Sequence, residues 1–145
     1  MCIRDRLTAR GQGRFRAYSA GARPAGQPHP LTLRTLHLAG LPTAGLASKG
    51  WDLFAGADAP RMDFVFTLCD AAAGETCPAW PGQPVTAHWG FPDPAAALGG
   101  EAEQLATFAE LFRQIDRRVS LFCALPLDAL DRLATTRAVA GLGRD

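Results

Sequence analysis

The stretch "MDFVFTLCDAAAGETCPAWPGQPVTAHWGFPDPA", residues 62–95, contains two apolar segments separated by a loop of small residues, glycine and proline. The first segment, residues 62–69, is nearly continuously apolar and rich in aromatic and β-branched residues. Such a run is typical of a strand buried on both faces of a parallel sheet. Residues 84–91 predict a second strand, which Pro92 and Pro94 end.

Helical patterns surround these strands. Apolar residues in 30–39 follow a helical period that Gly40 and Pro42 stop, and a short helix is expected near Trp51 within 46–54. The clearest helix, about 20 residues long, ends before Pro126 and is followed by a second one over 127–140. Its apolar stripe consists of Leu105, Phe108, Phe112, Ile115, Val119 and Phe122.

The remaining pattern lies near the start of the chain. Residues 14–21, "RFRAYSAG", alternate in polarity and predict a short strand. Strands that alternate with helices indicate an α/β domain with a small, mainly parallel sheet flanked by helices. In such sheets the functional loops follow the carboxyl ends of the strands, so Cys69 and Phe91 should flank one crevice.

Composition excludes several classes of protein. The chain has 15 basic and 14 acidic residues, a net charge of +1, which gives no reason to expect nucleic acid or an acidic membrane as a partner. No run of about 18 apolar residues predicts a membrane span. Four cysteines without a secretory signal favour a reducing compartment, so we expect a cytoplasmic protein.

Cys69 and Cys77 are separated by seven residues. A disulfide needs Cα atoms about 4.4–6.8 Å apart. Eight steps of helix span about 12 Å, and eight extended steps about 27 Å. The segment must therefore loop back for the two sulfur atoms to meet. The pair is open to four interpretations: buried reduced thiols, a redox pair, a static disulfide, or metal ligands joined by His29 and His88, although this spacing matches no standard zinc finger.

Asp93 stands directly before Pro94. Aspartate is a favoured N-cap and proline a favoured first helical residue, so a cap is one prediction. A general acid facing the crevice is the other, and the two are compatible. His88 alternates with Trp89 and is expected to be a hydrogen-bonded core residue rather than a ligand. Cys123, on the long helix, is expected to be a core residue as well.

Three segments together resemble the arsenate reductases of the low-molecular-weight protein-tyrosine-phosphatase family. They are "AYSAG" at 17–21, "MDFVFTLCDAAAGETCPAWPG" at 62–82 and "AHWGFPDPA" at 87–95. The resemblance runs from about Gly13 to Ala134, and the ordered combination of the second and third segments makes it specific.

The resemblance implies a four-stranded parallel sheet flanked by helices and a nucleophilic cysteine in a Cys-x5-Arg loop, where backbone N–H groups hold an oxyanion. Asp93 then corresponds to the general acid, and Cys69 and Cys77 to the second and third cysteines of a relay that reduces arsenate or another small oxyanion. No bound cofactor or metal is implied. An external thiol reductant, thioredoxin or the glutathione/glutaredoxin system, would restore the thiols.

One departure from the family pattern is large. Arginine follows none of the four cysteines at the sixth position, and "MCIRDRLTARGQG" stands where the oxyanion loop is expected. We therefore expect residues 1–12 to be a non-native or disordered segment, and residues 13–145 a single domain that is incomplete at its N-terminus. That domain would lack the first, central strand, and the chain alone would lack catalytic competence. Cys2 is not taken as the nucleophile.

Two other functions stay open. One is a phosphatase of the same family that hydrolyses phosphotyrosine or a small phosphate ester. The cysteine pair argues against it, because phosphate hydrolysis needs no resolving thiols. The other is a degenerate, non-enzymatic sensor of oxyanions or of redox state.

Overall fold

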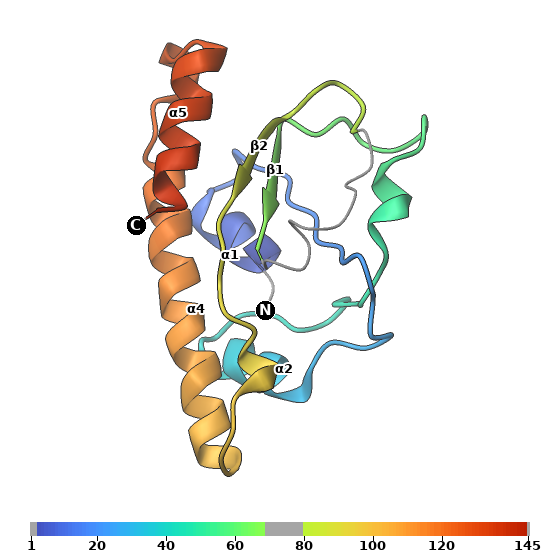
Figure 1. Ribbon diagram of the computed structural model, residues 1–145, viewed down its shortest axis with the longest axis vertical. Helices are drawn as coiled ribbons and strands as arrows, with labels where there is room; N and C mark the ends of the chain where they lie inside the picture. The colour runs from blue at the N-terminus through green and yellow to red at the C-terminus, as the bar shows by residue number, and fades with distance from the viewer. Residues whose placement is uncertain (1–2, 69–79, 145) are drawn as a thin grey trace.

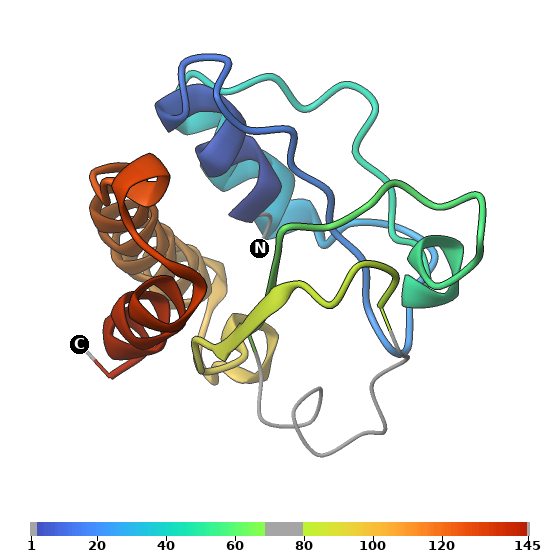
Figure 2. The same ribbon diagram turned by 90° about the horizontal axis from the view of Figure 1, so that it is seen from above.

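The computed structural model describes residues 3–68 and 80–144 of the chain, with two parallel strands in the middle and helices mainly on one side (Figure 1). Seen from above, the long connection that contains η1 lies on the side away from α4 (Figure 2). The elements in chain order are α1 (Ile3–Arg10), α2 (Pro30–Leu38), η1 (Trp51–Phe54), β1 (Phe64–Thr67), β2 (Val85–His88), η2 (Pro94–Ala96), α4 (Glu101–Cys123), η3 (Leu127–Ala129) and α5 (Arg132–Leu142).

The two strands pair in parallel, with Phe64 opposite Val85 and Thr67 opposite His88, so both predicted strands are confirmed. The pairing continues past the strands, where the Phe91 amide donates to the Leu68 carbonyl at 2.6 Å. The prediction of burial on both faces was wrong for β1, which is half-buried throughout. Among the described residues β1 has one neighbouring strand, and α4 and α5 lie on one side of the sheet. The four strands that the resemblance implies are thus not found in the described part of the chain.

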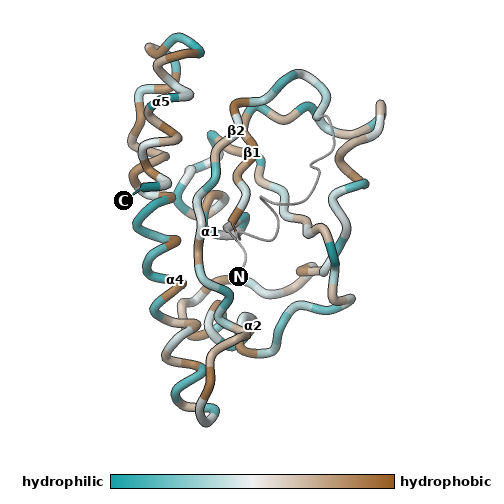
Figure 3. The backbone as a smooth tube through the Cα atoms, in the orientation of Figure 1, coloured by the Kyte–Doolittle hydropathy of each residue, from teal (hydrophilic) through white to brown (hydrophobic). Residues whose placement is uncertain are grey.

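Helix α4 confirms the long predicted helix and runs 23 residues. Hydrophobic and hydrophilic residues alternate along it in Figure 3. Its buried residues are Phe108, Leu111, Ile115, Val119 and Phe122. Helices α1, α2 and α5 all contact it, so α4 is the central support of the fold. Within the described residues, no helix combines the length and apolarity needed to cross a bilayer.

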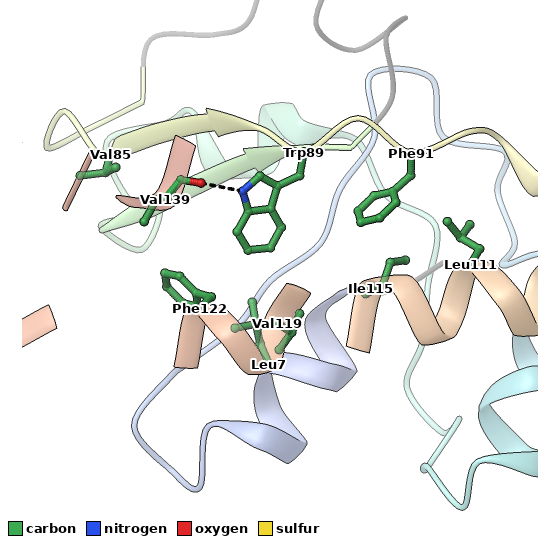
Figure 4. Close-up of a cluster of buried hydrophobic side chains, with 9 residues drawn as sticks. All are labelled: Leu7, Val85, Trp89, Phe91, Leu111, Ile115, Val119, Phe122 and Val139. Carbon is green, nitrogen blue, oxygen red and sulfur yellow. Dashed lines mark hydrogen bonds between the residues drawn. The ribbon is translucent and has the colours of Figure 1, made fainter. Parts of the chain in front are cut away.

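The main hydrophobic cluster lies between α4 and the sheet (Figure 4). Trp89, just beyond β2, is fully buried, and its ring stacks on Phe66 with centroids 4.0 Å apart. The indole Nε1–H donates to the Val139 carbonyl at 3.1 Å. A buried indole needs such a partner, and this one ties α5 to the end of β2. The cluster comprises Leu7, Val85, Trp89, Phe91, Leu111, Ile115, Val119, Phe122 and Val139.

The predicted strand over residues 14–21 was wrong. Residues 15–20 have no strand assignment, and a single bridge joins Gly21 to Gly50. The alternation did predict which side chains face inward, because Phe15 and Ala17 pack against the main cluster. A strand also needs a neighbour for its backbone groups. Among the described residues, no strand lies beside this segment to supply one.

Residues 3–10 form helix α1, which packs on α4. Two of its arginines hold one carboxylate: Arg6 Nε donates to Asp116 at 2.8 Å, and Arg10 donates to both Asp116 oxygens at 2.9 and 3.0 Å. The structure therefore places a helix within the segment expected to be disordered or non-native. The domain boundary at residue 12 stays a prediction.

Candidate active site

A groove of about 360 Å³ lies between the segment after β2 and the first half of α4. Pro92, Asp93 and Pro94 form one wall. The other wall is part of α4 and consists of Ala106, Thr107, Glu110, Leu111 and Gln114. Asp93 is thus exposed at the edge of a largely apolar hollow, in the loop that follows the carboxyl end of β2. That is where an α/β sheet is expected to place its functional groups.

Asp93 caps the short helix η2, as predicted. Its carboxylate accepts from the Ala95 amide at 3.0 Å, and Pro94 is the first helical residue. The backbone of Asp93, at φ −75° and ψ 112°, is extended, as expected for a residue before proline. One carboxylate oxygen is bonded to Ala95, which holds the carboxyl group in a defined place beside the groove.

Glu110 is the second carboxylate that borders the groove. Hydrogen bonds from Gln114, at 3.1 Å, and from Arg113, together with the charge of Arg113, lower the pKa of Glu110. A lowered pKa makes a carboxyl group a weaker candidate for a proton donor. Asp93, which the sequence already indicates, stays the candidate general acid at this groove.

The two candidate cysteines, Cys69 and Cys77, lie outside the described residues. The residue just before them, Leu68, is described, and its carbonyl accepts the Phe91 amide proton. The last described residue before the segment 69–79 is thus hydrogen-bonded to Phe91, two residues before Asp93. The role of Cys69 and Cys77 in a relay stays a prediction.

The histidines differ from the sequence expectation in an informative way. His88 does have a hydrogen bond, with Thr67 Oγ1 2.8 Å from its Nδ1, but it is exposed, so its placement in the core was wrong. Alternation along β2 puts Val85 and Trp89 on the buried face and His88 on the other. His29, which the sequence offered only as a possible metal ligand, caps α2: its Nδ1 accepts from the Leu31 amide at 3.2 Å. Its position directly before Pro30 was the available signal.

Cys123 ends α4, far from the groove. Gln114 borders the groove, and the nine residues from there to Cys123 correspond to about 14 Å of helix. The Cys123 thiol borders a second hollow of about 320 Å³, next to Arg10 and Arg14. Burial raises the pKa of this thiol, while the charges of Arg14 and Arg10 oppose the shift. A thiol with a raised pKa is mostly protonated at neutral pH and reacts slowly.

Cys123→Ser is expected to lower the free energy of unfolding by about 1 kcal/mol, because a half-buried thiol that packs on the hydrophobic cluster becomes a more polar hydroxyl. Urea unfolding measures that loss. The substitution should leave oxidation and reduction of the other cysteines unchanged. A structural role for Cys123 would be contradicted if Cys123→Ser abolished oxidation and reduction of the other cysteines but left the free energy of unfolding unchanged.

Comparisons with known proteins point to one family. The family model described as low molecular weight phosphotyrosine protein phosphatase matches residues 1–133. Proteins named arsenate reductase from Bacillus licheniformis and Bacillus subtilis are 33% and 32% identical to the chain over 108 residues. Those alignments cover 74% of this chain and 74% of each relative.

A third relative, also named arsenate reductase, comes from Halalkalibacterium halodurans and is 42% identical over 62 residues. That alignment covers 43% of this chain and 44% of the relative, so this match spans less than half the length of that protein. The family model, by contrast, matches most of the chain, including both strands, the Asp93 segment and α4. The chain belongs to the low molecular weight phosphotyrosine protein phosphatase family.

Proposed function

We propose that the protein belongs to an arsenate-reducing branch of its family and takes part in reduction of arsenate to arsenite by a cysteine relay. The observation that carries the proposal is the pair Cys69 and Cys77, which stands in sequence order before Asp93. Hydrolysis of a phosphate ester leaves no oxidised sulfur to resolve, whereas reduction of arsenate must oxidise two thiols to one disulfide. The relatives named arsenate reductase support this choice.

In this mechanism a thiolate from a Cys-x5-Arg loop attacks arsenate, and the Asp93 carboxyl protonates the oxygen that leaves as water. Cys69 then attacks the sulfur of that thiol–arsenic adduct. Two electrons pass to arsenic, arsenite leaves, and a first disulfide forms. Cys77 attacks the Cys69 sulfur, which moves the disulfide to Cys69–Cys77 and frees the nucleophile.

Residues 1–145 supply the later cysteines and the proposed acid but contain no Cys-x5-Arg sequence. We therefore do not expect these residues alone to reduce arsenate. The final reductant in the proposal is an external thiol carrier, thioredoxin or glutaredoxin with glutathione, in a cytoplasmic setting. No bound cofactor enters the reaction.

The test uses the later half of the relay. We expect mild oxidation of the chain with diamide to give an intramolecular Cys69–Cys77 disulfide, identified by peptide mapping. Reduced thioredoxin should reopen it, with NADPH consumed through thioredoxin reductase. In Cys77→Ser that thioredoxin-dependent consumption should be lost.

Cys123→Ser is the matched control, since it removes a thiol that lies away from the groove and should leave the disulfide intact. Both thiols staying free after oxidation would refute the relay. Rapid hydrolysis of an aryl phosphate by a form of the protein that carries a Cys-x5-Arg loop, with arsenate reduction unchanged in its Cys77→Ser variant, would favour the phosphatase instead.

A further inference from the structure

Arg118 joins α4 to the segment that leads to Asp93. The side chain is half-buried, and its Nη1 donates to the Trp89 carbonyl at 3.0 Å. The same guanidinium lies over the Phe91 ring, with its carbon 4.4 Å from the ring centroid. One cation thus makes a charge-assisted hydrogen bond and a cation–π contact to neighbouring parts of one short segment.

The end of β1 holds the same segment through backbone hydrogen bonds. The Trp89 amide donates to the Thr67 carbonyl at 2.8 Å, and the Phe91 amide donates to Leu68 at 2.6 Å. Residues 89–91 are therefore held both by β1 and by Arg118. Trp89 and Phe91 are both buried, so the segment has little room to shift while these contacts persist.

The position of Phe91 is transmitted to Asp93 through a stiff piece of chain. Proline fixes φ of Pro92, and a residue that precedes proline is restricted to extended backbone, as Asp93 is here. Few free dihedral angles thus separate the Phe91 ring from the Asp93 carboxylate. Whatever holds Phe91 also sets where that carboxylate meets the groove.

We propose that Arg118 is a positioning residue for Asp93: it clamps residues 89–91 to α4 and thereby fixes the carboxylate at the edge of the groove. The catalytic meaning of the clamp rests on the proposed function, in which Asp93 is the general acid. Arg118 does not need to touch a substrate for this role. Its neighbour Arg117 is exposed and provides a control at the next position of the same helix.

The experiment compares Arg118→Met, Arg118→Lys and Arg117→Met in chains of residues 1–145 by amide NMR. The Ala95 amide reports on the clamp because it donates a hydrogen bond to the Asp93 carboxylate. The Asp93→Ala variant gives the reference signal of an Ala95 amide without this bond. In Arg118→Met the Ala95 signal should move at least halfway to that reference. The hydrogen-exchange rate of the Phe91 amide should rise about tenfold relative to that of the Val85 amide, which donates to the backbone carbonyl of Asp63.

Arg118→Lys keeps a cation and a donor, so its Ala95 signal and its Phe91 exchange rate should lie between those of wild type and Arg118→Met. This variant remains informative if Arg118→Met fails to fold. Arg117→Met should match the wild type. An unmoved Ala95 signal in both Arg118 variants, or equal acceleration of the Phe91 and Val85 amides, would overturn the proposal. Neither readout needs turnover or a thiol, so failure of the relay test and failure of the clamp are separate results.

Discussion

Phe122→Ala is expected to lower the free energy of unfolding by about 3–5 kcal/mol. The side chain is 1% exposed and lies where α4 meets the sheet. Removing the ring loses its transfer free energy and leaves a cavity that rigid neighbours cannot fill. Those neighbours are four aromatic rings whose centroids lie 5.1–6.1 Å away, namely Phe64, Phe15, Phe66 and Trp89.

The matched control is Leu121→Ala, one position earlier on the same helix. Leu121 is 42% exposed, so its truncation should cost far less, under about 1 kcal/mol. Urea unfolding followed by tryptophan fluorescence compares the two variants, and Trp89 should report on the same packing. Because a domain is typically stable by about 5–15 kcal/mol, the Phe122 variant should lose a large share of its folded stability. Equal losses for both variants would mean that Phe122 is not the centre of the core.

Asp116→Asn is expected to destabilise the protein by about 2–3 kcal/mol. Its carboxylate binds Arg6, which is 8% exposed, and Arg10. The substitution leaves the buried Arg6 cation without its counter-charge. Glu101→Gln is the control, since the Arg34–Glu101 pair also joins two helices but is solvent-exposed and should contribute at most about 1 kcal/mol.

The Asp116 contribution should depend on pH in a defined direction. Hydrogen bonds from Arg10 and Arg6, and the charges of both, lower the pKa of Asp116 in the folded protein, while burial opposes the shift. Its contribution is then complete above the unfolded pKa of about 3.9 and is lost as pH falls through the folded value. The difference in free energy of unfolding between wild type and Asp116→Asn should be constant above about pH 5 and should decrease below about pH 4.

Urea midpoints of both proteins across that range measure this difference. This comparison also bears on the domain boundary predicted at residue 12. If Asp116→Asn lowered the free energy of unfolding no more than Glu101→Gln does, and if that loss did not depend on pH, residues 3–10 would not pack on α4 in solution.

Local pattern predicted α2, α4 and the two paired strands well, but not α1. The stripe from Leu105 to Phe122 has a single apolar face, which only a helix lying on a core can bury. The aspartate–proline pair at 93–94 likewise implied its cap, because the capped amide belongs to Ala95, only two residues further along the chain. Features that depend on neighbouring residues in the chain could therefore be found without the fold.

Features that need a distant partner could not. The alternation in residues 14–21 placed Phe15 inward but could not show that no strand would pair with it among the described residues. The stack of His29 on Phe108, with ring centroids 4.8 Å apart, joins residues far apart in the sequence. Helix α4 forms the second wall of the groove beside Asp93, and no sequence motif in α4 indicated that wall.

By itself, the sequence determined the α/β class, the family resemblance and the candidates Cys69, Cys77 and Asp93, because these follow from residue order and local spacing. Tertiary structure alone decided that Asp93 borders a groove on α4, that Gln114 and Arg113 lower the pKa of Glu110 there, and that Arg118 contacts the segment leading to Asp93. The physical reason is that pKa shifts, cation–π contacts and hollows depend on distances between side chains, which local pattern does not encode.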